Sequence, residues 1–479
     1  MTAADIAAQV LDLVRAGAGS SAQAEVMVAT THQALTRFAN SFIHQNVADT
    51  DTAVRLRVHV NGRTAAGATT LADAGGLRGL VERTLAAAAL CPPDPGWPGL
   101  AEPAPLAGPA QVDESVLAAT PADLAERVRS FVDAAKGLET AGYCRTVHKS
   151  ATFANSAGQA VTGATTEAAL DGIARTGGAD GMARLAATGL AALDGAVLGA
   201  RAAAKARAGM DPVELPPGRY EVVLEATAVA DVLRNLAFWG FNGKTYVQRR
   251  SFAVLDAAQF DPAVTLVDDP VGTEAFGLPF DAEGTPKRRL VLVDAGVTRI
   301  VPHDRRTAAE AGTASTGHAL PDGETWGPVP VNLRLLPSPP AGATPGPATG
   351  ATTGSAATLG AGPAEVDGPA ADSDVAALLA NVERGLLVTD LWYTRVLDPK
   401  TLVMTGLTRN GVWLVEDGAV TRPVRNFRFT QSYPQALGLG AVRGTGRFPV
   451  PMPGSWGGER FVPPALHLAS WNFTGGASG

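Results

Sequence analysis

The chain has seven histidines and two cysteines, but none of them falls in a short motif that could carry out chemistry alone. The sequence lacks a His-Glu-x-x-His zinc helix, a Walker loop and a Gly-x-Ser-x-Gly elbow. Cys144 and His148 stand four residues apart on a predicted strand, so both side chains point to the same face. This spacing is weak support for a nucleophile and its base. The histidines are interpreted chiefly as ordinary surface or half-buried side chains.

Carboxylates offer a second candidate for chemistry. Four of them crowd a loop-rich stretch: Asp268, Asp269, Asp281 and Glu283. Paired carboxylates can act as acid and base, although in loops they more often cap turns. Lys287 follows closely and is expected, with two arginines, to neutralise them. Together with His303 and His318, these carboxylates could form the site of an independent hydrolase, and this alternative stays open.

The elements that must position these residues differ between the two halves of the chain. In the first half, Thr2 with Asp5 and Thr120 with Asp123 predict capped helix starts, and Pro121 suits a first helical turn. Strands are predicted at three places, the last of them running into an Asn-Gly turn: residues 25–29, 38–46 and 54–60. An alanine-rich run at residues 179–208 predicts a helix.

In the second half, strand signals dominate from residue 213 onward. A strand is predicted at residues 220–224, and a meander follows near the end, with Asn410-Gly411 and Asp417-Gly418 as its turns. We therefore predict an α+β fold, with an N-terminal mixed α/β domain at residues 1–212 and a β-rich, barrel-like C-terminal domain at residues 213–479. The stretch at about 337–372 consists mostly of Pro, Gly, Ala and Thr, with almost no large apolar residue, and is predicted to be a flexible loop.

Composition excludes several classes of protein. Two cysteines among 479 residues cannot form a disulfide scaffold or a four-thiolate zinc site. No apolar run reaches the roughly 18 residues that span a membrane, and no signal peptide is visible. The net charge of −7 argues against a protein that coats nucleic acid. The expectation is a cytoplasmic protein that binds neither membrane nor nucleic acid directly.

Several runs carry polar and glycine positions that generic strands do not need. They are Gly-Leu-Pro-Phe-Asp-Ala-Glu-Gly at 277–284, Ser-Thr-Gly-His at 315–318, Thr-Asp-Leu-Trp-Tyr-Thr-Arg at 389–395, Thr-Gly-Leu-Thr-Arg-Asn-Gly at 405–411, Phe-Arg-Phe-Thr-Gln-Ser at 427–432 and Trp-Asn-Phe-Thr at 471–474. Together and in this order they resemble the TldD/PmbA family, whose members are also described as modulators of DNA gyrase. The resemblance covers nearly the whole chain and is strongest after Pro212.

The resemblance implies subunits that pair around an enclosed chamber. In such pairs one subunit carries zinc, bound by a His-Glu-x-x-x-His helix and a later cysteine, and hydrolyses unfolded or leader peptides. The other subunit, called TldE or PmbA, lacks the metal ligands. By approximate register, Arg234, Asn235 and Trp239 stand where the zinc motif would be, and no cysteine follows Cys144. Because guanidinium and indole offer no lone pair to a metal, this chain resembles the metal-free subunit, with zinc expected only in a partner.

The function predicted from the resemblance is a non-catalytic subunit of a TldD/TldE-like heteromeric metallopeptidase. Its partner would be a zinc-bearing TldD-like subunit, and it would help to hold an unfolded or leader peptide by strand-edge hydrogen bonds. The alternative is a stand-alone homodimer that binds peptides or another protein without peptidase activity. Five residues are candidates for lining the chamber or binding peptide, unless they serve only as turn and cross-strand pairs: Trp392, Tyr393, Arg395, Thr408 and Arg409.

Overall fold

The computed structural model describes residues 1–479 except 109–110, 322, 339–371, 455–457 and 477–479. The predicted flexible loop at 337–372 therefore lies almost entirely outside the described residues. The first half of the chain contains, in order, α1 (Ala3–Ala18), β1 (Gln23–Ala39), β2 (Phe42–Val60), β3 (Arg63–Thr69), α2 (Ala74–Leu90), α3 (Glu114–Leu117), α4 (Pro121–Ala134), β4 (Glu139–Asn155), β5 (Ala160–Arg175), β6 (Asp180–Ala187), η1 (Leu190–Ala192) and α5 (Gly195–Ala208).

The second half contains more and shorter strands. They and their helices are β7 (Gly218–Leu224), α6 (Ala226–Asn235), the π-turn η2 (Leu236–Gly240), α7 (Gly243–Val247), β8 (Leu266–Asp268), β9 (Leu290–Asp294), β10 (Val297–Thr298), α8 (Arg305–Ala311), α9 (Gly323–Trp326), β11 (Leu333–Leu335), α10 (Ser373–Leu379), β12 (Arg384–Asp398), β13 (Val403–Glu416), β14 (Ala419–Pro423), β15 (Phe427–Ser432), α11 (Tyr433–Ala436), β16 (Val442–Thr445), β17 (Met452–Pro453), β18 (Arg460–Phe461) and β19 (Leu466–Gly476).

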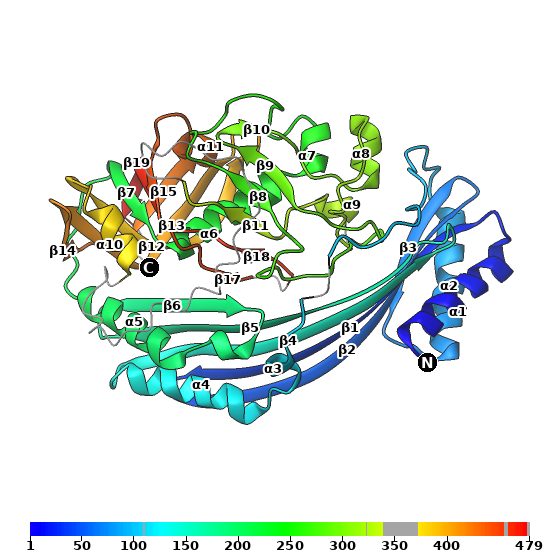
Figure 1. The fold of residues 1–479 in the computed structure, drawn as a ribbon, viewed down its shortest axis with the longest axis horizontal. Coiled ribbons are helices and arrows are strands. Elements are labelled where there is room, and N and C mark those ends of the chain that lie inside the picture. The colour runs from blue at the N-terminus through cyan, green and yellow to red at the C-terminus, as the bar shows by residue number, and fades with distance from the viewer. Residues whose placement is uncertain (109–110, 322, 339–371, 455–457, 477–479) are drawn as a thin grey trace.

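The first half forms one long antiparallel sheet in the order β3-β2-β1-β4-β5-β6. Side chains alternate between the faces of a strand, so the even-numbered residues of β1 share one face. Val26 on that face packs in the core beneath α1 and α2, and Phe38 in the core beneath α4 and α5. Both helix pairs thus cover the same face, one at each end (Figure 1). The opposite face, through Met27, meets Leu278 and Phe280 of the second half.

The second half closes a ring of strands. Strand β12 pairs with β7, β7 with β19, β19 with β15, β15 with β13, and β13 again with β12. Helix α6 lies against this ring, because Val229, Val232 and Leu233 pack in one core with Leu386 and Val388. Figure 1 shows the ring lying over the concave side of the long sheet. The predicted α+β class with a barrel-like second half is confirmed.

Local capping explains where the helices of the first half begin. The Thr2 hydroxyl accepts from the backbone N–H of Asp5, whose carboxylate accepts from the Thr2 N–H in return. Helix α4 repeats this reciprocal box with Thr120 and Asp123, and Pro121 occupies its first turn. Such boxes satisfy N–H groups that a helix start would otherwise leave unpaired.

Three predicted elements differ from the structure. The run at 38–46 is interrupted by Asn40 and Ser41, both with positive φ, which form the tight turn between β1 and β2. The first part of the alanine-rich run is strand β6, because its small residues let α5 pack closely: a Cβ on Gly181 would lie 2.1 Å from the Ala202 carbonyl oxygen. Tertiary packing here overrides helix propensity.

The third difference concerns Asn410-Gly411, which was predicted to be a hairpin turn. Both residues have positive φ, as such a turn requires, yet the chain continues straight through them within β13. The pairing register with β12 shifts at this point, so the two residues form a bulge. The bulge buries the Asn410 side chain and directs it toward β12.

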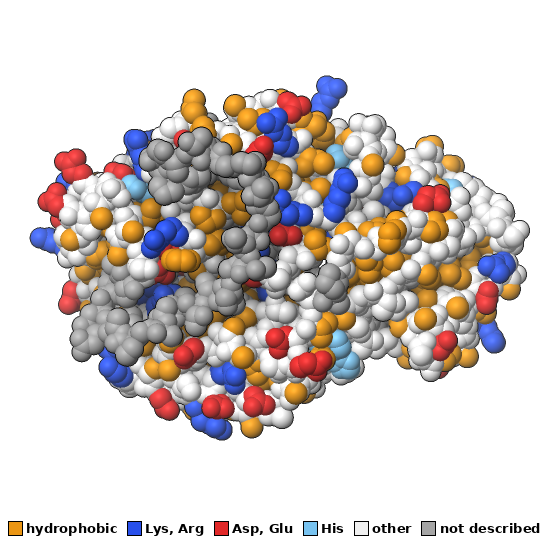
Figure 2. Space-filling view, viewed as in Figure 1, with side chains coloured by type: hydrophobic (Ala, Val, Ile, Leu, Met, Phe, Trp, Pro, Cys, Tyr) orange, Lys and Arg blue, Asp and Glu red, His pale blue; other side chains and the backbone are white. Residues whose placement is uncertain are grey.

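On the face shown in Figure 2, acidic and basic side chains are interspersed along the lower border, where α4 and α5 lie in Figure 1. These helices thus carry a mixed-charge outer surface. Within the described part of the chain, every helix is too short or too polar to cross a membrane.

Candidate functional site

A polar cluster surrounds Asp231, which projects from α6 toward β12 and α11. Its carboxylate accepts hydrogen bonds from the Thr394 hydroxyl at 2.9 Å and from the Tyr433 hydroxyl at 3.1 Å. The Asn235 amide donates to it at 3.1 Å, one helical turn away, and the Arg234 guanidinium lies 3.6 Å from it. We call these five residues the α6 polar cluster. They bring together three elements that are far apart in the sequence.

Burial governs the charge of this region. Burial raises the pKa of Asp231, although the Arg234 charge and its hydrogen-bond donors act in the opposite direction. Asp390 of β12 is 4% exposed and accepts from the Asn410 amide at 3.0 Å. Burial raises the pKa of Asp390 to about 6. The positive charge of Arg184 acts to lower this pKa, and the negative charge of Asp231 acts to raise it. The carboxylates therefore exchange protons closer to neutral pH than ordinary aspartates do.

The three residues at the predicted zinc-motif position lie in and just after α6. Arg234 and Asn235 are its last two residues and both contact Asp231, while Trp239 lies in the π-turn η2. A guanidinium cannot lose its proton and an indole N–H only donates, so neither can bind a metal, and the Asn235 amide nitrogen is already engaged as a donor. These side chains do not fit a zinc ion.

Three of the predicted peptide-binding residues form an exposed surface on β12. Trp392 is 48% and Tyr393 is 62% exposed. The Arg409 guanidinium lies 4.6 Å from the Trp392 ring centre, and the Arg395 guanidinium lies 4.2 Å from that of Tyr393. The register of β12 with β13 shifts between Trp392 and Arg395. We call these four residues the aromatic bulge.

The bulge also links this exposed surface to the buried cluster. Tyr393 has φ of 53°, a left-handed conformation that is costly for a side chain other than glycine. The next residue, Thr394, is buried and donates to Asp231. The bulge therefore turns two aromatic rings outward while it directs a hydroxyl inward to α6. Bulges of this kind frequently lie beside functional sites.

Thr408, the remaining predicted residue, is placed differently. It is buried, and its hydroxyl donates to the Asn426 side chain at 3.2 Å and accepts from the Phe427 backbone N–H at 2.9 Å. These bonds join β13 to the start of β15, which is a structural role. Thr408 is therefore not part of the exposed surface on β12.

Part of the predicted hydrolase site does come together: His303, His318 and Asp268. His318 Nε2 lies 3.0 Å from Asp268 Oδ2, and its Nδ1 lies 2.9 Å from the Thr316 hydroxyl. This order resembles a nucleophile–base–acid chain. However, these residues are at most 4% exposed, and the Thr316 hydroxyl already accepts from the His303 backbone N–H at 2.7 Å. A substrate cannot reach these hydrogen-bonded side chains, so we interpret them as a buried structural network.

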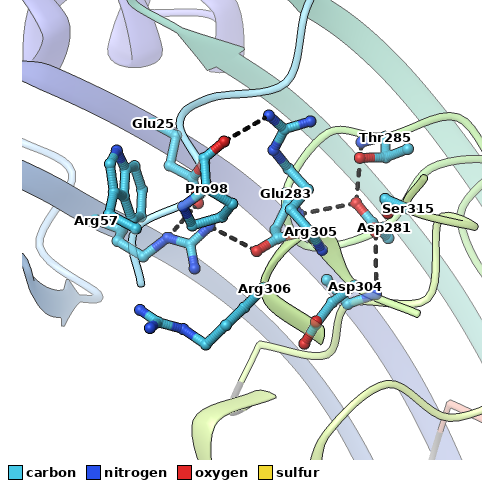
Figure 3. A network of polar contacts seen from close by, with 12 residues as sticks. Glu25, Arg57, Pro98, Asp281, Glu283, Thr285, Asp304, Arg305, Arg306 and Ser315 are labelled. Atoms are coloured by element: carbon cyan, nitrogen blue, oxygen red, sulfur yellow. Dashed lines mark hydrogen bonds and ion pairs between the residues drawn. The ribbon is translucent and has the colours of Figure 1, made fainter. Parts of the chain in front are cut away.

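Glu283 belongs to a second network that ties the long sheet to the second half (Figure 3). Arg57 of β2 donates to Glu25 of β1 at 2.6 Å and to Glu283 at 2.9 Å. The Arg305 backbone N–H, at the start of α8, donates to the other Glu283 oxygen at 2.9 Å. Asp281 nearby accepts from three backbone N–H groups, and burial with the Glu283 charge raises its pKa to about 7. Glu283 therefore links the two halves through Arg57, whereas the hydrogen bonds of Asp281 stay within the second half.

Cys144 and His148 do not form a reactive pair. Both lie on β4, but Cys144 is fully buried in the core beneath α4, where burial raises its pKa to about 12. His148 instead stacks on His32 of β1, with ring centres 5.6 Å apart. Four residues along a strand also separate the two side chains by about 13 Å.

The sequence did not single out Asp231, Asp390 or Tyr433. Asp390 lies within the run at 389–395, and Asp231 lies three residues before Arg234. What the sequence could not show is their common burial, because it depends on the closure of the strand ring.

Comparisons with known proteins bear on this geometry. Residues 217–453 match the family described as the PmbA/TldA metallopeptidase C-terminal domain. No curated protein matches the chain. That family match includes α6, the aromatic bulge and Tyr433, and so contains the whole α6 polar cluster.

Solved structures resemble the chain over its full length. TldE from Thermococcus kodakarensis is 18% identical with a TM-score of 0.80, and 98% of this chain and 100% of that one are covered. A proposed modulator of a DNA gyrase from Thermotoga maritima is 16% identical with a TM-score of 0.79, at 99% and 100% coverage. A proposed modulator of DNA gyrase from Bacteroides thetaiotaomicron is 17% identical with a TM-score of 0.78, at 98% coverage of both chains.

At these identities the structural likeness establishes the shared fold, and the family match establishes the relationship. The predicted resemblance is confirmed at the level of the family: through its C-terminal half, the chain belongs to the metallopeptidase-like TldD/PmbA family.

Proposed function

We propose that the chain is the metal-free, non-catalytic subunit of a TldD/TldE-like heteromeric metallopeptidase. A zinc-bearing TldD-like partner would cleave unfolded or leader peptides, and this chain would complete the chamber and help to hold the peptide. The observation that carries the proposal is the occupancy of the motif position. Arg234 and Asn235 are committed there to Asp231, and neither they nor Trp239 offer a zinc ligand.

The aromatic bulge supports a binding role. Trp, Tyr and Arg are the residue types most enriched among the energetically dominant residues of interfaces. Here two exposed rings each lie beside a guanidinium, and the strained backbone at Tyr393 holds them outward. Strain at such a position is retained where the surrounding structure enforces it, often for function. We assign this surface to contact with the partner subunit or with the peptide.

One observation favours the second candidate, a homodimer that binds peptides without cleaving them. Strand β3 pairs with β2 only from Val54 to Val60, so the preceding stretch of β2, residues 42–53, has no strand partner among the described residues on that edge. An open edge is a template for another strand.

Mass photometry of the purified chain, alone and mixed with a zinc-bearing TldD-like protein, separates the two candidates. The subunit proposal predicts a stoichiometric mixed complex that Trp392→Ser weakens at least tenfold, with the exposed Phe448→Ser as the matched control. A chain that stays a homodimer in the presence of the partner supports the second candidate instead.

A further inference from the structure

Two lysines lie near the contact between the long sheet and the second half, and their side-chain ammonium groups have no hydrogen-bond partner in the described structure. The chain has six lysines. Lys205 pairs with Glu225, Lys400 donates to the Ser251 carbonyl, and Lys244 donates to carbonyls near α9. Lys136 is exposed to water. Lys149 and Lys287 remain. Lys149 is half-buried and Lys287 is buried, and the ammonium group of neither makes a hydrogen bond to any residue that the structure describes.

The strand register places Lys149 on the face that meets the second half. On β4 it is two and four residues from Ala151 and Phe153, which pack there with Leu278 and Phe280. Its neighbour across the strands on β5 is Thr165, whose hydroxyl accepts from the Gly277 backbone N–H at 3.3 Å. The segment 277–280 therefore runs directly beside Lys149.

Lys287 approaches the same place from the second half. Its backbone N–H donates to the Pro279 carbonyl at 2.9 Å, and Pro279 lies against Gly163 of β5, where an added Cβ would meet the proline ring at 2.5 Å. Only 9% of Lys287 is exposed. The sequence predicted that Lys287 neutralises the acidic stretch, and the charges of Asp268 and Asp281 do act to raise its pKa. Its ammonium makes no hydrogen bond to a described residue there.

The nearby carboxylates are occupied by other donors. Asp268 accepts from His318 and from the Asn332 backbone N–H, and Asp281 accepts from three backbone N–H groups. Burial lowers the pKa of both lysines. The charges of Lys287 and Arg55 lower that of Lys149 further, whereas the charges of Asp268 and Asp281 act to raise that of Lys287. The two ammonium groups repel each other, and neither donates to an acceptor in the described structure, so an anion placed between them would stabilise both.

We propose that Lys149 and Lys287 form a binding site for a peptide carboxylate. The site rests on the proposed peptide-handling function and adds to it a recognition element: a charged end or acidic side chain of the peptide held between the sheet and the second half. A carboxylate is the chemistry that matches, because each of its two oxygens can accept from one ammonium group.

The test uses the full-length chain alone, without a partner subunit or zinc. Binding of acetylated tetra-alanine with a free carboxyl end is compared by calorimetry with that of its C-terminal amide and of an amidated acetyl-Ala-Asp-Ala-Ala. We expect at least one carboxylate peptide to bind at least tenfold more tightly than the amide. The two carboxylate peptides distinguish a chain end from a side chain. Equal binding of all three would overturn the site.

Variants locate the effect. Lys149→Met and Lys287→Met should each abolish the tenfold preference, and Lys136→Met, on the surface, should retain it. A preference that survives both substitutions contradicts the assignment.

In case Lys287→Met does not fold, a labelling experiment on the wild-type chain replaces it. At pH 8, Lys149 should react with acetic anhydride faster than Lys136, and the preferred carboxylate peptide, but not the amide, should slow that reaction. No protection would overturn the proposal and leave the subunit proposal standing.

Discussion

The carboxylates of the α6 region show how burial sets the charge of single residues. Asp231 is compensated by Arg234 and three neutral donors, whereas Asp390 relies on one amide and the more distant Arg184. Because Asp390 has fewer partners that stabilise its negative charge, its ionisation in the folded state lowers the free energy of unfolding. A carboxyl group with a folded pKa above its unfolded value binds its proton more tightly in the native state.

The first prediction concerns Asp390. Its folded pKa of about 6 exceeds the ordinary value of 3.8, so its contribution to stability is present below about pH 4 and is lost as the pH rises toward 6. The loss is at most about 3 kcal/mol, since one pKa unit corresponds to about 1.4 kcal/mol. Asp390→Asn should therefore gain stability relative to wild type between pH 4 and 7, measured by urea unfolding. The exposed Asp133→Asn serves as control, and parallel pH curves for wild type and Asp390→Asn would contradict the assignment.

At the scale of elements, two bulges in adjacent strands shape the candidate site. The bulge at Asn410 directs an amide inward to Asp390, and the aromatic bulge turns rings outward. An Asn-Gly pair predicts positive φ correctly, yet positive φ is compatible with a bulge as well as with a turn. Long-range pairing with β12 decides between them, and this pairing is not visible in the local sequence.

The second prediction separates stability from binding at Tyr393. Its φ of 53° costs about 1–2 kcal/mol for a non-glycine residue. Tyr393→Gly should therefore retain the melting temperature while weakening partner or peptide binding. Tyr393→Val, which is β-branched and poorly suited to positive φ, should lower the melting temperature by several degrees. Calorimetry checks both variants, and a glycine variant less stable than the valine variant would show that the ring, rather than the backbone, sets stability here.

For the whole molecule, the network around Arg57 joins parts of the chain more than 200 residues apart. One guanidinium bridges Glu25 of the long sheet and Glu283 of the second half (Figure 3). Burial raises the pKa of Glu25, so its charge depends on this arginine. We propose that the network holds the two domains, at residues 1–212 and 213–479, in a fixed relation.

The third prediction follows from this bridge. Arg57→Met leaves two buried carboxylates without their partner and should destabilise the chain by about 3–5 kcal/mol in denaturant unfolding. A matched control is Arg175→Met, which removes a more exposed ion pair with Asp180 and should cost less than about 1 kcal/mol. Similar losses in the two variants would show that the network does not stabilise the contact between the halves.

Much of the fold could be predicted because its signals are local. The capping boxes at Thr2 and Thr120 and the turn at Asn61-Gly62 occur as expected. Strand β6 was not predicted, because its alanines and glycine look like a helix in the sequence. In the structure these small residues allow α5 to pack closely against the strand. The sequence predicted the exposed residues Trp392 and Tyr393 of the site. It could not predict the contact between Asp231 and Tyr433, because only the closure of the strand ring brings these two residues together.

The proposed function requires that this chain does not cleave peptides by itself. The most direct measurement is cleavage of an unfolded, casein-like substrate by the purified chain, alone and with a zinc-bearing TldD-like subunit, each with and without a chelator. We predict no cleavage by the chain alone, and cleavage by the mixture that the chelator abolishes. Cleavage by the chain alone that resists the chelator would contradict the account and return attention to an independent hydrolytic site.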